Sequence, residues 1–508
     1  MKLDKHDSYI GLAIAVIVIG ALLRFILAVI ATPASDGCWF LNVARYMAVN
    51  GKIPLFEHLG RDIFARPPLL PILAAFFYKI FGVFGDNIAV ISMRLVSPIF
   101  GSLTLLFSFL VIKKIFNSKL AFYSVLFLSF IPMHLVFSSL SQADMIVSFF
   151  VLLSIYFLLN NKIFLSGTAV GLATLSKETG FLILILLFYL LFAKYKADIK
   201  LMSKKAVTLI VPFFVIVLPW FIRNYTYLKN PIWPFFSSVI GGVQGGEMSS
   251  LEGTASLLNI FYIKDHLTTT YLGVFGVPNG EISNLFFFNL PFIKLLLIGW
   301  FLATLLFVFP FILGLFKIDY KSKKIKLLLV WFLSYFLVYF YHIIEPGKAY
   351  PRFLLPAFTV FAVIWSIGFN KISNIKIIAK PYLLLIILCV MGFISASFVK
   401  TTLTNNEWNA YKDDFRWVVE NTEEDAKFIT EGQCITYQLN RETYAPWQEY
   451  DKNFKFDNNS YVWVNQNFRL ERLSILPENT LNEIEANSSF KLAYFNEKTG
   501  TKIYHYLD

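Results

Sequence analysis

Residues 8–30 read SYIGLAIAVIVIGALLRFILAVI, an apolar run with a single charged residue. A transmembrane helix needs about 20 apolar residues to cross the ~30 Å hydrocarbon layer, and this run meets that length. Because the run is too long for the core of a signal peptide, we expect it to be retained as a first helix. The rest of the chain has the same character, with 57% hydrophobic, 18% aromatic and only 15% charged residues among 508. The sequence therefore predicts an α-helical polytopic membrane protein.

About eleven spans of this kind can be drawn along the chain. Their approximate bounds are 8–30, 88–112, 119–138, 145–160, 163–176, 179–193, 206–222, 291–316, 327–343, 353–369 and 381–399. With the N-terminus inside, the Lys-rich connections all fall on the cytoplasmic side, and they are Lys113-Lys114, Lys162, 194–205, 317–326 and 371–380. This positive-inside pattern explains the net charge of +12 without a nucleic-acid partner. We expect a multi-pass protein of the plasma membrane, in contact with membrane lipids and with a cytoplasmic N-terminus.

The segments assigned to the outer side complete a membrane domain over residues 1–399. Its first outer loop, 31–87, contains the apolar stretch 67–82, which is too short to cross and predicts an amphipathic helix at the outer interface. The long outer loop, 223–290, carries Gly241-Gly242 and Gly245-Gly246 and is typical of a flexible loop that covers a site.

Residues 400–508 form a second domain by composition, because Asn, Asp and Glu become frequent. We expect a helix near 407–420, strands at 426–430, 461–464, 490–495 and 501–507, and a hairpin turn at 496–500. The tail is therefore predicted to be a small soluble extracytoplasmic α/β domain.

Three cysteines make no disulfide framework. Cys38 and Cys434 are both assigned to the outer side, so a bridge between them is conceivable, but we expect them to be unbridged. Cys389 lies in a predicted span as a small apolar residue. The six His residues are scattered, and we expect no metal site and no cofactor. A divalent ion held by Asp36 and Asp144 stays open as an alternative.

The charged residues outside the Lys-rich connections gather on the predicted outer side. Asp36 follows the first span and could act as a general base or simply cap the helix that follows. Arg66 precedes Pro67-Pro68 and could bind a phosphate or anchor the interfacial helix to lipid headgroups. Lys177 and Glu178 separate two short spans, either facing a cavity or forming an ordinary surface loop.

Further candidates lie at other predicted membrane boundaries. Asp144 stands at the outer start of the fourth span, and Arg223 stands where a span enters the long outer loop. A short outer loop holds Glu345, Lys348 and Arg352, of which the last begins a helix. An anion would be favoured there by the helix dipole, whereas snorkelling would explain the two cations without function.

Taken in order, these segments resemble the polyprenyl-phosphate-sugar-dependent glycosyltransferases of the GT-C fold, in the branch of protein O-mannosyltransferases and the aminoarabinose transferase of lipid A. The resemblance covers about residues 8–399. The matching residues are Asp36, the basic Arg66 before Pro67-Pro68-Leu69, Gly171 to Glu178, Pro219-Trp220 with Arg223-Asn224 and Asn230-Pro231, and Arg352 to Pro356.

The resemblance implies that Asp36 is the general base. Many family members have an Asp-Glu pair there, but Gly37 follows in this chain, so the role of a second carboxylate could fall to Asp144. Arg66, Arg352 and Lys177 would then neutralise the donor phosphate. Glu178, Arg223, Glu345 and Lys348 are candidates for a supporting role.

The implied activity is transfer of a sugar from a dolichyl or undecaprenyl phosphate donor to an acceptor hydroxyl on the outer face, with inversion. The acceptor could be a protein, a lipid or a polysaccharide. A transporter or lipid-linked sugar flippase is the alternative, and a sensor with the tail as binding module is third. An oligosaccharyltransferase is disfavoured because its Trp-Trp-Asp motif is absent from the sequence.

Overall fold

The computed structural model describes residues 5–31, 36–54, 66–232, 241, 260–275, 293–344, 351–373, 411–430, 433–444, 454–465 and 478–507. The chain divides into two compact units. The first unit comprises Met1–Ala31, Arg66–Leu70 and Arg94–Leu403, and the second comprises Thr32–Ala65, Pro71–Met93 and Thr404–Asp508.

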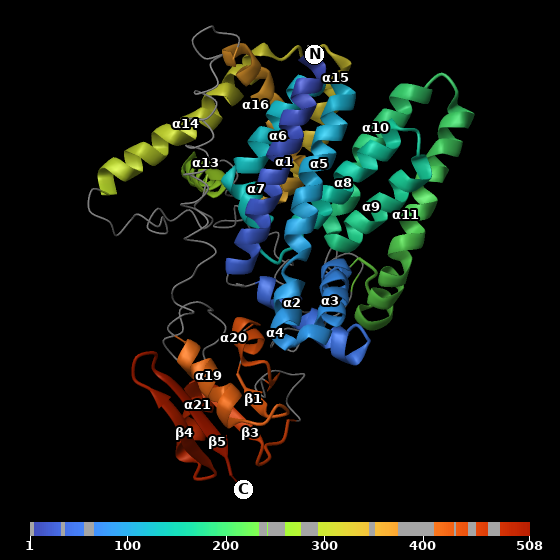
Figure 1. The fold of residues 1–508 in the computed structure, drawn as a ribbon. Coiled ribbons are helices and arrows are strands. Elements are labelled where there is room, and N and C mark those ends of the chain that lie inside the picture. The colour runs from blue at the N-terminus through green and yellow to red at the C-terminus, as the bar shows by residue number, and fades with distance from the viewer. Residues whose placement is uncertain are drawn as a thin grey trace. The chain divides into compact units, whose positions relative to one another are not determined.

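The first unit is a helical bundle. Its elements are α1 (Lys5–Ile30), α5 (Val96–Ile115), α6 (Ser118–Phe130), α7 (Pro132–Phe137), α8 (Asp144–Leu159), α9 (Ile163–Ser176), the 3₁₀ helix η2 (Glu178–Leu182), α10 (Ile183–Tyr195), α11 (Ile199–Leu228), α13 (Ile260–Phe275), α14 (Ile293–Lys317), α15 (Lys323–Ile344), the 3₁₀ helix η5 (Pro351–Ala357) and α16 (Phe358–Ser373). Neighbouring helices pack in the series α11, α9, α8, α5, α6, α16 and α14, while α1 packs against α5 and α6 (Figure 1).

Six helices are long and apolar enough to cross a membrane within the described part of the chain. Large hydrophobic side chains remain exposed on them, such as Ile26 in α1, Val215 in α11 and Leu302 in α14. A soluble bundle would bury such residues, whereas lipid accommodates them. The chain is therefore an integral membrane protein. The predicted span 381–399 lies outside the described residues.

Several observed helices differ from the predicted spans. The span 119–138 is two helices, α6 and α7, because the extended backbone of Ile131 and the following Pro132 interrupt the helix. The span 88–112 is divided at Arg94-Leu95 into α4 (Asp86–Met93) and α5. The predicted long loop 223–290 contains the helix α13, and α11 extends into it as far as Leu228.

Close helix packing in the bundle depends on glycine. A Cβ atom added at Gly167 in α9 would lie 1.9 Å from the carbonyl oxygen of Leu209 in α11, and one at Gly171 would lie 2.7 Å from Ile216 Cβ. The two glycines are four residues apart, so they occupy one face of α9. Small residues at this spacing let membrane helices approach to backbone contact.

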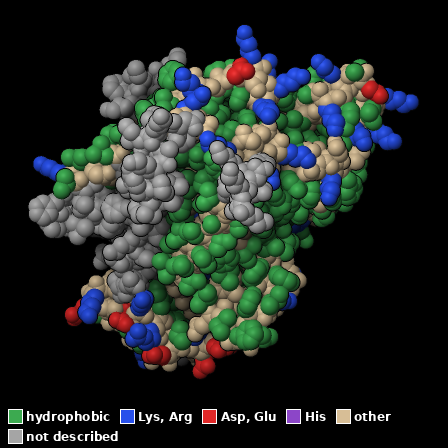
Figure 2. Space-filling model, turned by 45° about the horizontal axis from the view of Figure 1, so that its top comes forward, with side chains coloured by type: hydrophobic (Ala, Val, Ile, Leu, Met, Phe, Trp, Pro, Cys, Tyr) green, Lys and Arg blue, Asp and Glu red, His purple; other side chains and the backbone are tan. Residues whose placement is uncertain are grey.

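The Lys-rich connections lie together at one end of the first unit. Lys114 in the last turn of α5 donates to the Asn160 side chain, and Lys194 in α10 donates to that of Asn161. Lys324 at the start of α15 lies 5.5 Å from the ring centre of Phe116. Figure 2 shows Lys and Arg side chains gathered over one end of helices whose sides are covered by hydrophobic residues.

The second unit combines short helices with a mixed sheet. Its elements are α2 (Asp36–Asn50), most of α3 (Leu69–Phe81), η1 (Gly82–Phe84), α4, α19 (Lys412–Asn421), β1 (Lys427–Ile429), α20 (Gln433–Leu439), β2 (Glu442–Tyr444), β3 (Ser460–Val464), α21 (Glu478–Ala486), β4 (Phe490–Asn496) and β5 (Thr501–Tyr506). The short helix predicted at 67–82 is confirmed as α3.

The five strands lie in the order β2-β1-β3-β5-β4. β1 is parallel to β2 and β3, while β5 is antiparallel to β3 and β4. Alternate residues of β3 face opposite sides: Val462 and Val464 pack with Ile484 of α21, whereas Trp463 stacks on Phe415 of α19 at 5.2 Å. Helices therefore cover both faces of the sheet (Figure 1).

The predicted α/β fold of the tail is confirmed. Four strands and the helix α19 occur where the sequence predicted them, and the turn at 496–500 joins β4 to β5. The strand β2 and the helices α20 and α21 were not predicted, since they are short and lack a regular apolar period.

Candidate functional site

An ion pair joins α8 to the segment after α9. Lys177 Nζ lies 2.6 Å from Asp144 Oδ1, and the two side chains are only 17% and 5% exposed. Helices α8 and α9 form a hairpin through the tight turn at Asn160-Asn161, so the first residue of α8 returns beside the last turn of α9. The hairpin thus brings together Asp144 and Lys177, which the sequence analysis named as two unconnected site candidates.

Lys177 occupies an extended position between α9 and η2. Gly180 makes this sharp reversal possible, because a Cβ atom there would lie 2.3 Å from the carbonyl carbon of Ala173. The adjoining Glu178 is half-buried, and the charges of Lys177 and Arg66 act on it. The polar break predicted between two short helices is therefore confirmed, and Arg66 belongs to its electrostatic surroundings.

A second cation lies beside the ion pair. Lys177 Nζ lies 4.3 Å from the ring centre of Phe353, and Arg352 Cζ lies 6.0 Å from the same centre. Arg352 Nη1 also donates to Gln142 Oε1 at 3.2 Å, and the carbonyl oxygen of Gln142 accepts from Ser97 Oγ. The element η5 packs against α8, which places Arg352 near the start of that helix. We call Gln142, Asp144, Lys177, Arg352 and Phe353 the cationic cluster.

The cationic cluster stands at the opposite end of α8 and α9 from the lysine-rich connections. α8 begins at Asp144 and ends beside Asn160, which binds Lys114. α9 begins after Lys162 and ends before Lys177. The bundle therefore carries positive charge of two kinds: exposed lysines such as Lys114 and Lys194 at one end, and the half-buried Lys177 and Arg352 at the other.

Arg223 has a different environment. Its guanidinium lies 4.6 Å from the ring centre of Trp220 and 5.8 Å from that of Tyr227, both on its own helix α11. It also donates to the side chain of Asn224. Aromatic rings beside an Arg are typical of a membrane interface. Glu345 and Lys348 lie outside the described residues.

Asp36 is the first residue of α2 in the second unit, and its side chain is half-buried. The residues after it, Gly37 to Leu41, are all buried. α2 packs against α20, where Arg45 lies 5.4 Å from the ring centre of Tyr437. The helix that carries the predicted base is therefore anchored to the C-terminal sheet region.

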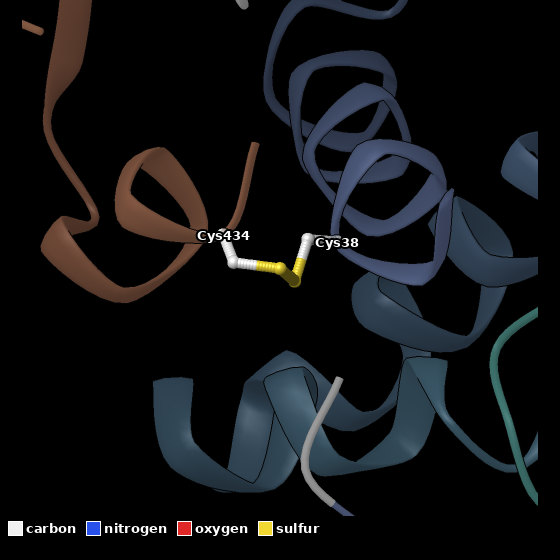
Figure 3. The surroundings of a disulfide bond; sticks show 2 residues. All are labelled: Cys38 and Cys434. Atoms are coloured by element: carbon white, nitrogen blue, oxygen red, sulfur yellow. A yellow bond between two sulfur atoms is a disulfide. The ribbon is translucent and has the colours of Figure 1, made fainter. Parts of the chain in front are cut away.

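A disulfide joins α2 to α20, and the expectation that these cysteines are unbridged is wrong. Cys38 and Cys434 are fully buried, with Cα atoms 5.0 Å apart, a separation typical of disulfides (Figure 3). The two residues are 396 positions apart, so no local pattern could have revealed the pairing. It depends on the packing of α2 against α20.

Sequence reasoning missed two further members of the cationic cluster. Gln142 lies in the polar stretch Ser138 to Asp144 at the predicted outer end of a span, and this break in an apolar run was the available signal. Phe353 lies in the matching stretch Arg352 to Pro356, but nothing singled it out among the 55 Phe residues of the chain. Among the residues that the structure describes, no group of three or more His, Cys, Asp or Glu side chains could hold a metal ion.

Comparison with known proteins agrees with the fold and with the resemblance drawn from the sequence. Residues 65–222 match the family described as dolichyl-phosphate-mannose-protein mannosyltransferase. No curated protein sequence matches the chain. The crystal structure of apo ArnT from Cupriavidus metallidurans is similar over 98% of both chains, with a TM-score of 0.64 and 14% identity.

Two lipid-bound structures are also similar. ArnT from the same organism bound to undecaprenyl phosphate matches over 97% of this chain and 98% of that one, with a TM-score of 0.62 and 14% identity. The archaeal oligosaccharyltransferase AglB from Archaeoglobus fulgidus, in complex with an inhibitory peptide and a dolichol-phosphate, matches over 86% of this chain and 64% of that one, with a TM-score of 0.52 and 16% identity. At these identities the likeness establishes the fold, and the predicted GT-C architecture with a small C-terminal sheet domain is confirmed.

Proposed function

We propose that this protein is a membrane glycosyltransferase that moves a sugar from a polyprenyl-phosphate donor to an acceptor hydroxyl on the outer face of the membrane. The match of residues 65–222 to a dolichyl-phosphate-mannose-dependent family supports this proposal, and the match includes Asp144 and Lys177. The fold shared with structures that hold undecaprenyl phosphate and dolichol-phosphate supports a lipid-linked donor.

The observation that carries the proposal is the cationic cluster. Two cations, Lys177 and Arg352, lie against one aromatic ring at the end of the bundle away from the lysine-rich connections. A polyprenyl-phosphate sugar releases a phosphate whose negative charge grows as the bond to the sugar breaks. A planar guanidinium and an ammonium fixed in place would stabilise that charge.

The reaction is a single displacement. The acceptor oxygen forms a bond to the anomeric carbon, while the bond from that carbon to the phosphate oxygen breaks and the electron pair leaves with the lipid phosphate. Asp36 accepts the proton of the acceptor hydroxyl. Arg66, Arg352 and Lys177 neutralise the phosphate, so the leaving group needs no proton.

The ion pair suggests a particular role for Asp144. Its carboxylate accepts a hydrogen bond from Lys177 at 2.6 Å, so it orients the ammonium while lowering the net charge of the cluster. Arg352 is oriented instead by the neutral Gln142 amide. We assign Asp144 to positioning Lys177, and the proton transfer to Asp36.

The proposal includes an orientation in the membrane. Lysine-rich connections face the cytoplasm in most membrane proteins, so the opposite end with the cationic cluster would face outward. The Cys38–Cys434 disulfide supports an outer location for the second unit, because disulfides persist in oxidising compartments. The N-terminus would then be cytoplasmic and the C-terminal domain extracytoplasmic.

The test is transfer of radiolabelled sugar from a panel of dolichyl- and undecaprenyl-phosphate sugars to membrane extracts. Wild type should label an acceptor, and Asp36→Asn should reduce labelling at least about 100-fold, in the range of general-base catalysis. Asp86→Asn is the matched control, since Asp86 also begins a short helix of the second unit and should transfer normally. Full turnover by Asp36→Asn would remove the base assignment. Absence of transfer from every donor would favour the flippase alternative and call for a lipid translocation assay.

A further inference from the structure

Arg24 is a fully buried cation inside the first membrane helix, and the proposed reaction does not use it. All of its described hydrogen bonds go to uncharged groups. Nη1 donates to the carbonyl oxygens of Gly20 at 2.8 Å and Ser129 at 3.3 Å, and Nη2 donates to that of Leu128 at 3.0 Å. Nη2 also lies 2.8 Å from His134 Nδ1. A buried charge on a membrane helix is costly and indicates a specific task.

Two of the three carbonyl groups that Arg24 binds, those of Leu128 and Ser129, lie at the end of α6, where Pro132 interrupts the helix. In a continuous α-helix the N–H of residue 132 would bond to the Leu128 carbonyl, and that of residue 133 to the Ser129 carbonyl. Pro132 has no N–H, and the helical series stops where Ile131 N–H bonds to the Phe127 carbonyl. Inside a bilayer no bulk water can satisfy the two oxygens. Arg24 supplies the missing donors.

The packing of α1 against α6 allows this contact. A Cβ atom at Gly20 would lie 2.9 Å from Ser129 Oγ and 3.0 Å from Leu105 Cδ1. Glycine at position 20 therefore lets the two helices approach closely, one turn before Arg24 reaches the end of α6. Arg24 thus closes α6 at its C-terminus and contacts the first turn of α7 through His134.

The bend that Arg24 closes leads directly to the cationic cluster. α7 ends at Phe137, and the next residues carry the chain to Gln142, the partner of Arg352, and to Asp144, the partner of Lys177. The end of α7 lies against α5, where a Cβ atom at Gly101 would be 2.5 Å from Ser138 Oγ. The direction of α7 therefore determines where Gln142 and Asp144 stand.

We propose that Arg24 is a positioning residue, which holds the Pro132 bend and thereby places Gln142 and Asp144 for the reaction. This inference rests on the proposed function for its catalytic consequence. Its structural part, the replacement of a missing backbone donor by a guanidinium, stands on the hydrogen bonds alone.

The experiment compares Arg24→Met with the double variant Arg24→Met/Pro132→Ala, in the full-length protein. Arg24→Met leaves buried carbonyl groups without donors, and the unfolding temperature should fall by about 5 °C. Alanine at position 132 restores the backbone N–H, so the double variant should regain at least about half of that loss. Lys114→Met is the matched control, because it removes an exposed cation and should change neither stability nor transfer.

Activity and hydrogen exchange separate positioning from stabilisation. In the double variant α6 can continue as a helix through position 132, so α7 is redirected. Transfer should stay at least about 10-fold below wild type in kcat/KM, and amide exchange in residues 138–143 should stay raised in both variants.

Three results would overturn the inference. Wild-type behaviour of Arg24→Met would show that the contact is dispensable. If the double variant does not regain stability, Arg24 does not replace the missing backbone donor. If transfer and amide exchange in the double variant both return to wild-type values, Arg24 stabilises the fold but does not position Gln142 and Asp144. If wild type transfers sugar from no donor, the proposed function fails, but stability and exchange still decide the role of Arg24.

Discussion

Variants of the ion pair between Lys177 and Asp144 can distinguish its contribution to stability from its proposed contribution to sugar transfer. Removing one partner of a buried pair leaves an uncompensated charge, which costs about 3–5 kcal/mol. Lys177→Met should therefore lower the unfolding temperature in detergent, and Asp144→Asn/Lys177→Met should recover most of it because no charge is left alone. Under the proposed function, sugar transfer should stay low in both variants, since the donor phosphate would lose a cation.

The control for this prediction is Lys502→Met. Lys502 pairs with Glu485, but both side chains are 40% exposed, and such surface pairs contribute only about 0–1 kcal/mol. If Asp144→Asn/Lys177→Met regains sugar transfer as well as stability, Lys177 contributes to folding only.

A second residue-scale prediction concerns acid. Hydrogen bonds from Lys427 and Ser460 lower the pKa of the Asp457 carboxyl in the folded protein. The unfolded chain then binds a proton more readily, so the stability that this group contributes is full above its unfolded pKa of about 3.9 and is lost as the pH falls through the folded value. The contribution is small, because the Asp457 side chain is 46% exposed.

Lys427→Met removes the largest cause of this shift. Amide hydrogen exchange in β1 and β3 should show the variant to be less stable than wild type at pH 6, with a difference that shrinks towards pH 3. A difference that is constant over this range would contradict the assignment.

At this scale the sequence identified Asp144, Lys177 and Arg352 as candidates but not their partners. Charges at the predicted outer ends of spans can be recognised from one sequence. Lys177 and Asp144 are 33 positions apart, and Arg352 and Gln142 are 210 apart, so the pairings depend on helix packing. The position of a residue at a membrane boundary was predictable, whereas the atom that it contacts was not.

Helix-scale packing gives a prediction on α9. Gly167→Ala would place a Cβ atom 1.9 Å from the Leu209 carbonyl oxygen, a backbone atom that cannot move alone, so α9 and α11 must separate. Overpacking of this kind costs about 1–3 kcal/mol. The unfolding temperature should fall, whereas Gly11→Ala, with no atom within 4 Å of the added Cβ, should be neutral or slightly stabilising. Equal effects of the two substitutions would refute the close contact.

Apolar length predicted most helices of the bundle, and backbone interruptions account for the errors. An average over twenty residues does not register one proline, so 119–138 was predicted as one span although Pro132 divides it. The sequence placed α8 and α9 within a residue or so of their observed bounds, because Asp144, Lys162 and Lys177 mark their ends.

The whole molecule has an organisation that composition alone could not predict. The change of composition near residue 400 suggested a boundary there, and the boundary at 399–400 stays a prediction. The second unit also includes residues 32–65 and 71–93, because α2 packs on α20 and is bridged to it. A unit built from distant segments cannot be recognised from local composition.

Because the disulfide persists only in an oxidising compartment, counting free thiols tests the proposed membrane orientation. Of three cysteines, Cys38 and Cys434 are bridged, so the folded protein should hold one free thiol, at Cys389. Denatured protein from intact membranes should therefore react with one maleimide–polyethylene glycol, and with three after reduction. Cys434→Ser should give two before reduction, and Cys389→Ser should give none. If the second unit faced the reducing cytoplasm, the bridge would not persist, and wild type would react three times without reductant. That result would reverse the proposed orientation while leaving the fold intact.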